Sequence, residues 1–124
     1  MGFFASVNGI VTPAAAATVS VLDNGFTFGD SVYETLRTYR GRPFHLDRHL
    51  TRLRTSAWRL GIAIPQGDEV FAQRLDEILD RAQNDESYIR LIVSRGEGDV
   101  SYRFDRIKGP TVILLVKPYE PFPT

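Results

Sequence analysis

The 124-residue sequence contains no cysteine, and this absence excludes several kinds of chemistry. Without a thiol, the chain can form no disulfide, no thiolate nucleophile and no cysteine-ligated metal centre. It has two histidines, His45 and His49, which together with Asp47 supply too few convergent ligands for a zinc site. We therefore expect no bound metal.

A net positive charge is also absent, because 15 basic side chains balance 15 acidic ones. A general nucleic-acid or anionic-membrane binder needs a positive field that collects phosphates, so we expect neither partner. Lysine is scarce among the 15 basic residues: Lys108 and Lys117 are lysine, and the other 13 are arginine. Arginine grips carboxylates and phosphates through its planar fork, but a GC-rich gene would give the same ratio, and both explanations stay open.

The sequence has no apolar run long enough to cross a bilayer. Its opening, MGFFASVNGIVTPAAAATVSV, has no basic leader, and Asn8 and Pro13 interrupt the apolar residues, which is unlike a secretory signal. We expect a cytoplasmic protein. The length and the hydrophobic share of 43% are typical of one globular domain.

Hydrophobic patterning predicts strands at both ends of the chain and helices between them. We expect strands over 3–11 with a turn at Asn8-Gly9, and over 17–23, 31–39, 44–46, 87–95 and 110–117, with turns at Gly25, Gly29 and 40–43. Apolar residues at steps of four and three predict a helix from Leu46 to Leu60, stopped by Gly61, and a second helix begins at Asp68. This order predicts an α+β fold, a mostly antiparallel sheet with two helices packed on one face, in which the apolar segment 110–117 is central.

Prolines at positions 118, 121 and 123 give the end of the chain a stiff, extended character. We therefore expect one domain over 1–117, and we expect 118–124 to begin a connector to a further domain.

Two strands carry aromatic and basic residues on one face each. Tyr33 and Arg37 share a face of the first strand, and Tyr88 and Arg90 share a face of the second, because side chains two or four residues apart point the same way. If the strands are neighbours, two phenols and two guanidiniums would line a surface suited to an anionic small molecule. A solvated outer sheet face would show the same pattern, so both interpretations stay open.

The first predicted helix carries Arg48, Arg52 and Arg59 outside its apolar stripe, within about 40° of one another around the axis. One of these arginines could reach a bound phosphate with His49 supporting it, or all three could lie on an ordinary solvated face. The glycine-rich SRGEGD (94–99) lacks the GxxxxGK[ST] spacing and precedes no helix, so we expect a loop there and not a phosphate-binding turn.

The segment DNGFTFGDSVYETLRTYRGRPFHLDRHLTRLRTSA (23–57) resembles the opening of class IV pyridoxal-phosphate enzymes. This fold-type IV family includes branched-chain and D-amino-acid aminotransferases and aminodeoxychorismate lyase. Its hallmark runs approximately D-x-G-aromatic-x-aromatic-G-D-[GS]-V-[FY]-E-x-[LI]-[RK], followed by H-[LIM]-x-R-L, here His49 to Leu53. YIRLIVSRG (88–96) is similar to a later strand of the same N-terminal domain, so the resemblance covers nearly the whole chain.

The resemblance implies pyridoxal 5'-phosphate as cofactor of the full-length enzyme, with Arg52 holding its phosphate, and we expect the 124-residue chain alone not to retain it. The substrate-binding residues that it implies are Tyr33, Arg37, Tyr88, Arg90 and Phe28, the last standing where branched-chain enzymes carry tyrosine. It also implies an amino acid and a 2-oxo acid as substrates, and a homodimer.

Two departures from the family limit what the resemblance implies. The loop EGDVSYRFDRIK (97–108) holds no histidine, unlike the D-amino-acid enzymes. Neither Lys108 nor Lys117 matches the motif of the lysine that forms the imine with the cofactor, so we expect no catalytic residue in this chain and no turnover by it alone. We expect the N-terminal domain of an aminotransferase, with branched-chain amino acids as candidate donors. The alternatives are aminodeoxychorismate lyase, or a non-catalytic anion-binding or dimerisation module.

Overall fold

The computed structural model describes residues 2–121 and contains one sheet with two long helices. The strands are β1 Phe4–Val7, β2 Ile10–Pro13, β3 Ser31–Tyr39, β4 Arg42–Pro43, β5 Ser87–Ser94 and β6 Thr111–Pro118. The helices are α1 Asn24–Thr27, α2 Leu46–Arg59 and α3 Asp68–Ala82, and two 3-10 turns are η1 Ala14–Ala16 and η2 Phe104–Arg106.

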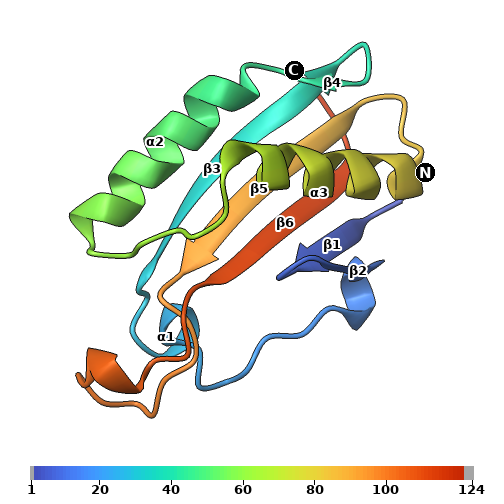
Figure 1. Ribbon diagram of the computed structural model, residues 1–124. Helices are drawn as coiled ribbons and strands as arrows, with labels where there is room; N and C mark the ends of the chain where they lie inside the picture. Colours follow the sequence, from blue (N-terminus) through green and yellow to red (C-terminus); the bar gives the residue numbers. More distant parts are fainter. Residues whose placement is uncertain (1, 122–124) are drawn as a thin grey trace.

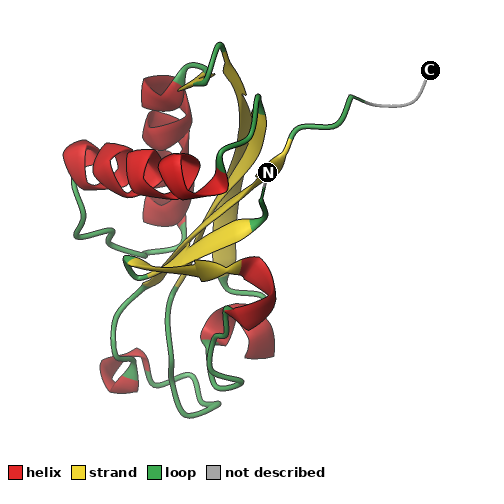
Figure 2. Ribbon diagram, turned by 90° about the vertical axis from the view of Figure 1, so that its right-hand side faces the viewer, coloured by secondary structure: helices red, strands yellow, loops and turns green. Residues whose placement is uncertain are grey.

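The sheet has the strand order β2-β1-β6-β5-β3-β4, and every neighbouring pair is antiparallel. β6 lies inside the sheet, as its apolar sequence predicts. Helices α2 and α3 lie on one face of the sheet (Figures 1 and 2). The predicted α+β fold, with two helices packed on one face, is confirmed.

The core lies between these helices and the sheet face that they cover. Helix α2 buries Leu50, Leu53 and Ala57 and ends before Gly61, whose φ of +74° glycine adopts without strain. Helix α3 buries Phe71, Leu75, Ile78 and Ala82, and the sheet contributes Leu36, Ile89, Leu91, Val93, Val112, Leu114 and Val116. Alternate residues of the strands therefore face the helices, and the residues between them form the open face of the sheet.

Two predicted strands are wrong. Residues 17–23 form no strand: the Ser20 carbonyl accepts a hydrogen bond from the Asp23 amide at 3.0 Å, the Ser20 hydroxyl accepts one from the Leu22 amide at 3.0 Å, and Val19 and Val21 are exposed. The segment crosses below the sheet towards α1 (Figure 1). The strand expected over 44–46 lies instead at Arg42–Pro43, because left-handed His45 (φ 54°) ends the extended chain and α2 begins at Leu46.

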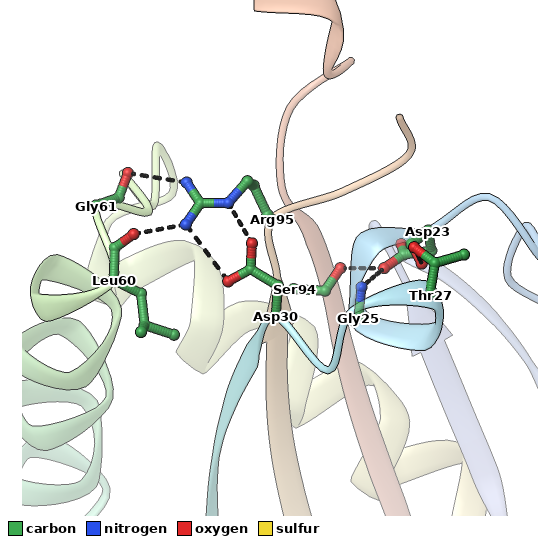
Figure 3. A network of polar contacts seen from close by, with 8 residues as sticks. All are labelled: Asp23, Gly25, Thr27, Asp30, Leu60, Gly61, Ser94 and Arg95. Carbon is green, nitrogen blue, oxygen red and sulfur yellow. Dashed lines mark hydrogen bonds and ion pairs between the residues drawn. The ribbon is translucent and has the colours of Figure 1, made fainter. Parts of the chain in front are cut away.

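The predicted turn at Gly25 is also wrong, because Gly25 lies inside α1; Gly29, at φ +67°, does turn the chain. The Asp23 carboxylate caps α1 by accepting from the Gly25 amide at 2.8 Å, and it also accepts from the hydroxyls of Ser94 and Thr111, each at 2.6 Å. These contacts fasten the segment before β3 to the end of β5, through the Asp23–Ser94 contact drawn in Figure 3, and to the start of β6, through Thr111.

A second group of contacts in Figure 3 ties the start of β3 to the end of α2. Arg95 pairs with Asp30, and its Nη2 atom donates to the Leu60 carbonyl at 2.6 Å. Positive charge stabilises the carbonyl end of a helix. The position of α2 over β3 is therefore fixed at this end.

The predicted connector 118–124 lies partly outside the described residues, which end at 121. β6 continues through Pro118, and the Tyr119 amide then donates to the Glu86 carbonyl at 2.9 Å. The expected domain 1–117 and its boundary stay predictions.

Candidate functional site

β3 carries Tyr33 and Arg37, and most of its outer edge is unpaired within residues 2–121. β3 pairs with β5 from Ser31 to Arg37, whereas on its other side β4 pairs only with Thr38 and Tyr39. In the described part of the chain, the outer edge over residues 31–37 therefore has no strand partner. Successive side chains of β3 point to opposite faces, so this edge strand contributes residues to the open face and to the helix-covered face.

The open face carries the predicted aromatic and basic residues side by side. In the β3–β5 register, Arg37 lies opposite Tyr88 and Thr35 lies opposite Arg90. Arg90 donates from Nη2 to the Tyr88 hydroxyl at 3.2 Å, and its guanidinium carbon lies 4.9 Å from the centre of the Tyr33 ring. The prediction that the two strands are neighbours is confirmed. The binding roles of these residues stay predictions.

A hollow of about 260 Å³ opens on this face. It is lined by Phe3, Tyr88, Arg90, Leu115 and Lys117. Within residues 2–121, neither Arg90 nor Lys117 forms an ion pair with a carboxylate, and the buried Nε of Arg90 has no acceptor. Two cations without a counter-charge make the hollow suited to an anion.

Sequence reasoning missed Lys117 as a member of this group. Its Nζ atom lies 5.3 Å from the centre of the Tyr88 ring, because Lys117 of β6 is directly opposite Tyr88 of β5. Strand alternation alone cannot show that Lys117 and Tyr88 lie on one face, because this depends on the register between β5 and β6.

Arg37 lies on the same face but is held by protein groups. Its guanidinium carbon stacks 4.0 Å from the Tyr39 ring centre and 3.7 Å from the Tyr119 ring centre, and its Nη2 atom lies 3.6 Å from a Glu86 carboxylate oxygen. A hydrogen bond from the Gly41 amide is the largest cause that lowers the pKa of Glu86, so this carboxylate is charged at neutral pH. Arg37 thus links the edge of the sheet to the segment after β6.

Phe28 lies apart from this group. Its ring packs against Tyr102 at 5.3 Å between centres, and it lines a different hollow of about 470 Å³ together with Asn24 and Leu60. The structure therefore does not bring Phe28 to the hollow that contains Tyr88 and Arg90.

Arg52 lies on the helix-covered side of β3, where Glu34 holds it. Its Nε atom donates to both Glu34 carboxylate oxygens at 2.9 Å, and its Nη2 atom donates to Oε1 at 2.8 Å. The Nδ1 atom of His49 lies 2.8 Å from the same Oε1. The Arg52 side chain is 68% exposed whereas that of Glu34 is 7% exposed, so the carboxylate lies inside and the guanidinium faces outward.

The charge state of Glu34 follows from these contacts. Burial raises the pKa of Glu34, but hydrogen bonds from Arg52 and His49 and the positive charge of Arg52 together lower it below its ordinary value of 4.5. The same contact raises the pKa of Arg52. Because an ionised carboxylate can only accept hydrogen bonds, Nδ1 of His49 carries the proton that it donates.

A shallow hollow of about 570 Å³ runs along the outer face of α2. It is lined by Asp47, Arg48, Thr51, Arg52, Thr55, Ser56 and Arg59. Of the three arginines, Arg52 is fixed by a carboxylate, whereas within residues 2–121 Arg48 and Arg59 form no ion pair. The expected support by His49 is indirect, since the ring contacts Glu34.

The described residues contain no group of three histidine or acidic side chains that could hold a metal ion. Within the same range, no helix is both long and apolar enough to span a bilayer.

Comparison with known proteins reveals matches to one family. The family model for amino-transferase class IV matches residues 31–124. A putative branched-chain-amino-acid aminotransferase of Methanocaldococcus jannaschii is 36% identical over 115 residues, which cover 93% of this chain and 40% of the relative. A D-alanine aminotransferase of Bacillus licheniformis is 31% identical over 113 residues, covering 91% of this chain and 40% of that protein.

The solved structures include a 4-amino-4-deoxychorismate lyase from Pseudomonas aeruginosa with a TM-score of 0.75 and 34% identity. The match covers 96% of this chain and 41% of the lyase chain. The 124-residue chain thus spans about 40% of the length of each of these three proteins.

Proposed function

Because this chain belongs to the class IV aminotransferases, we propose that it forms the domain that holds the cofactor phosphate and the substrate carboxylate in a pyridoxal-phosphate-dependent transaminase. The observation that carries the proposal is the pairing of Arg52 with buried Glu34 at the free edge of β3. This pair holds one arginine of α2, Arg52, in a fixed position in which its guanidinium faces outward.

The residues present fit the cofactor of the family, pyridoxal 5'-phosphate. A guanidinium matches a phosphate dianion in charge and in the spacing of its donors, and Nη1 of Arg52 has no protein partner in the described part of the chain. When bound, the cofactor supplies the aldehyde that takes up an amino group and the electron-withdrawing ring that makes the α-proton of an amino acid acidic.

On the open face, we assign substrate binding to the Arg90 guanidinium and the Tyr88 hydroxyl, with the Tyr33 ring beside them. Arg90 would pair with the substrate carboxylate, since the part of the chain that the structure describes gives it no carboxylate of its own. Arg37 and Phe28 are assigned to the border of the site, through the Tyr119 stack and the Tyr102 contact. Fixing the carboxylate orients the α-carbon and so selects which of its bonds breaks.

The lysine that takes the α-proton is proposed to lie in another part of a longer protein. Lys117 lines the hollow that contains Tyr88 and Arg90, but it does not match the motif of the reactive lysine. The chain also spans only 40% of the length of the Methanocaldococcus jannaschii relative. We expect the 124-residue chain alone neither to retain the cofactor nor to turn substrates over.

The transferred group is proposed to be the amino group of an amino acid, with a 2-oxo acid as acceptor and branched-chain amino acids as the first donors to test. The relative of 36% identity supports this choice. The 34% identity to a lyase favours aminodeoxychorismate lyase as the second candidate. A non-catalytic anion-binding or dimerisation module is the third.

We further propose a cytoplasmic homodimer. The loops around α1 and η2 gather at one end of the sheet (Figure 1). They expose several apolar side chains. These are Val21, Phe26, Phe28, Val100, Tyr102 and Phe104. An exposed apolar surface of this kind is typical of a contact between subunits.

The product of the complete gene tests the proposed function directly. We expect it to develop visible absorbance with pyridoxal 5'-phosphate and to transfer amino groups in a screen of amino-acid and oxo-acid pairs. Release of pyruvate from aminodeoxychorismate without transfer would identify the lyase. A colourless, inactive product in the presence of the cofactor would contradict both enzyme assignments and leave the module.

A further inference from the structure

Glu34 is an acidic residue on the core-facing side of β3, and the proposed function gives it no contact with a ligand. Its side chain is 7% exposed, and the next residue on the same side of the strand is buried Leu36. Removing a carboxylate from water is costly unless hydrogen bonds and opposite charge compensate it. Both are present here, because Arg52 supplies hydrogen bonds and a positive charge and His49 supplies a further hydrogen bond.

The contacts of Glu34 restrict Arg52 to one orientation. Both oxygens accept from Nε and Oε1 also accepts from Nη2, so the inner edge of the guanidinium is occupied and Nη1 stays available. His49, one turn before Arg52 on α2, contacts the same Oε1 and limits rotation of the carboxylate.

We propose that Glu34 and His49 act as positioning residues that orient Arg52 for an incoming phosphate and thereby set the affinity for phosphorylated cofactor. This inference rests on the proposed function, in which Arg52 holds the phosphate. A free arginine loses the freedom of several rotatable bonds when it binds an anion, whereas one already held by a carboxylate has lost that freedom before the ligand arrives.

Orientation and charge act in opposite directions on phosphate binding. Glu34 carries a negative charge that repels a phosphate, so its loss would tighten binding if charge dominated. Arg52 lies between this carboxylate and solvent, since Glu34 is buried and Arg52 is largely exposed. We therefore expect orientation to dominate, and the sign of the change distinguishes the two effects.

The test compares two probes, pyridoxamine 5'-phosphate and pyridoxamine, whose affinities for the apo form of the complete gene product are measured by calorimetry. Their ratio isolates the contribution of the phosphate. Arg52→Ala is expected to weaken binding of the phosphorylated probe about 10- to 100-fold. Glu34→Gln is expected to weaken it about 5- to 10-fold, with less than about a twofold change for pyridoxamine.

A double variant separates positioning from general stability. If Glu34 acts through Arg52, adding Glu34→Gln to Arg52→Ala should change the affinity for the phosphorylated probe less than about twofold. Equal losses for both probes, tighter binding by Glu34→Gln, or independent losses in the double variant would overturn the inference. No effect of Arg52→Ala on the phosphate contribution would instead overturn the assignment of Arg52, and with it both proposals.

His49 provides a second test that leaves Glu34 in place. His49→Ala removes the donor at Nδ1, whereas the amide of His49→Asn can place a nitrogen near the same position. We expect His49→Ala to weaken binding of the phosphorylated probe about two- to fivefold, and we expect His49→Asn to retain most of the original affinity. Equal affinities for the two variants would contradict a positioning role for His49.

Discussion

Replacing Arg90 by glutamine removes one positive charge from the open face of the sheet and leaves a shorter side chain that can still donate a hydrogen bond. A hydrogen bond to a charged group contributes about 1.5–3 kcal/mol. Arg90 is half-buried, so solvent weakens the interaction towards the lower end of that range. A loss of about 1.5–2 kcal/mol corresponds to about a 10- to 30-fold rise in KM for the amino donor.

The assay is steady-state transamination by the complete gene product with saturating cofactor, because it measures KM and kcat separately. Only the KM values of carboxylate-bearing substrates should rise. We expect kcat to stay within about threefold of its starting value, because the glutamine amide can still orient the carboxylate and the lost charge interaction contributes alike to ground and transition states. Arg81→Gln, at an exposed position near the end of α3, is the matched control. A normal KM for Arg90→Gln, or a loss confined to kcat, would refute carboxylate binding by Arg90.

Three further predictions concern stability and assembly. Leu53→Ala should lower the free energy of unfolding by about 2–5 kcal/mol in a urea titration, because Leu53 is fully buried, whereas exposed Thr55→Ala should change it by less than about 0.5 kcal/mol. In the folded protein the pKa of Glu34 lies below its ordinary value of 4.5, so the carboxylate contributes to stability above pH 4.5, and this contribution disappears as the pH falls through the folded pKa. In Glu34→Gln this part of the pH dependence of the free energy of unfolding should vanish. An unchanged pH dependence would contradict the ion pair. Phe26→Ser with Tyr102→Ser should convert a dimer into a monomer in sedimentation analysis, because these side chains are 73% and 84% exposed; a dimer that persists would place the contact elsewhere.

The helices could be predicted from the sequence because their burial follows a period of 3.6 residues. Leu50, Leu53 and Ala57 are spaced for one face of α2, and all three are buried. The same reasoning failed for residues 17–23, where Val19 and Val21 alternate but stay exposed. Local pattern cannot show that a serine turn and the distant hydroxyls of Ser94 and Thr111 set the path of that segment.

For the candidate site, strand alternation correctly grouped Tyr33 with Arg37 and Tyr88 with Arg90. It could not show which arginine of α2 is fixed, because the distinguishing contact comes from Glu34, 18 residues earlier and on another element. A side-chain pair of this kind depends on how α2 packs over β3 and on their register. The resemblance to the family selected Arg52, and its binding of phosphate is still a prediction.

The central claim is that Arg52 holds the cofactor phosphate, and the most direct measurement compares cofactor retention in two variants of the complete gene product. Arg48→Ala is the partner for Arg52→Ala, because both arginines border the hollow along α2 while Arg52 alone of the two pairs with Glu34. We predict that dialysis strips pyridoxal 5'-phosphate from Arg52→Ala and leaves Arg48→Ala as coloured as the unmodified protein. Equal retention by the two variants would contradict the account.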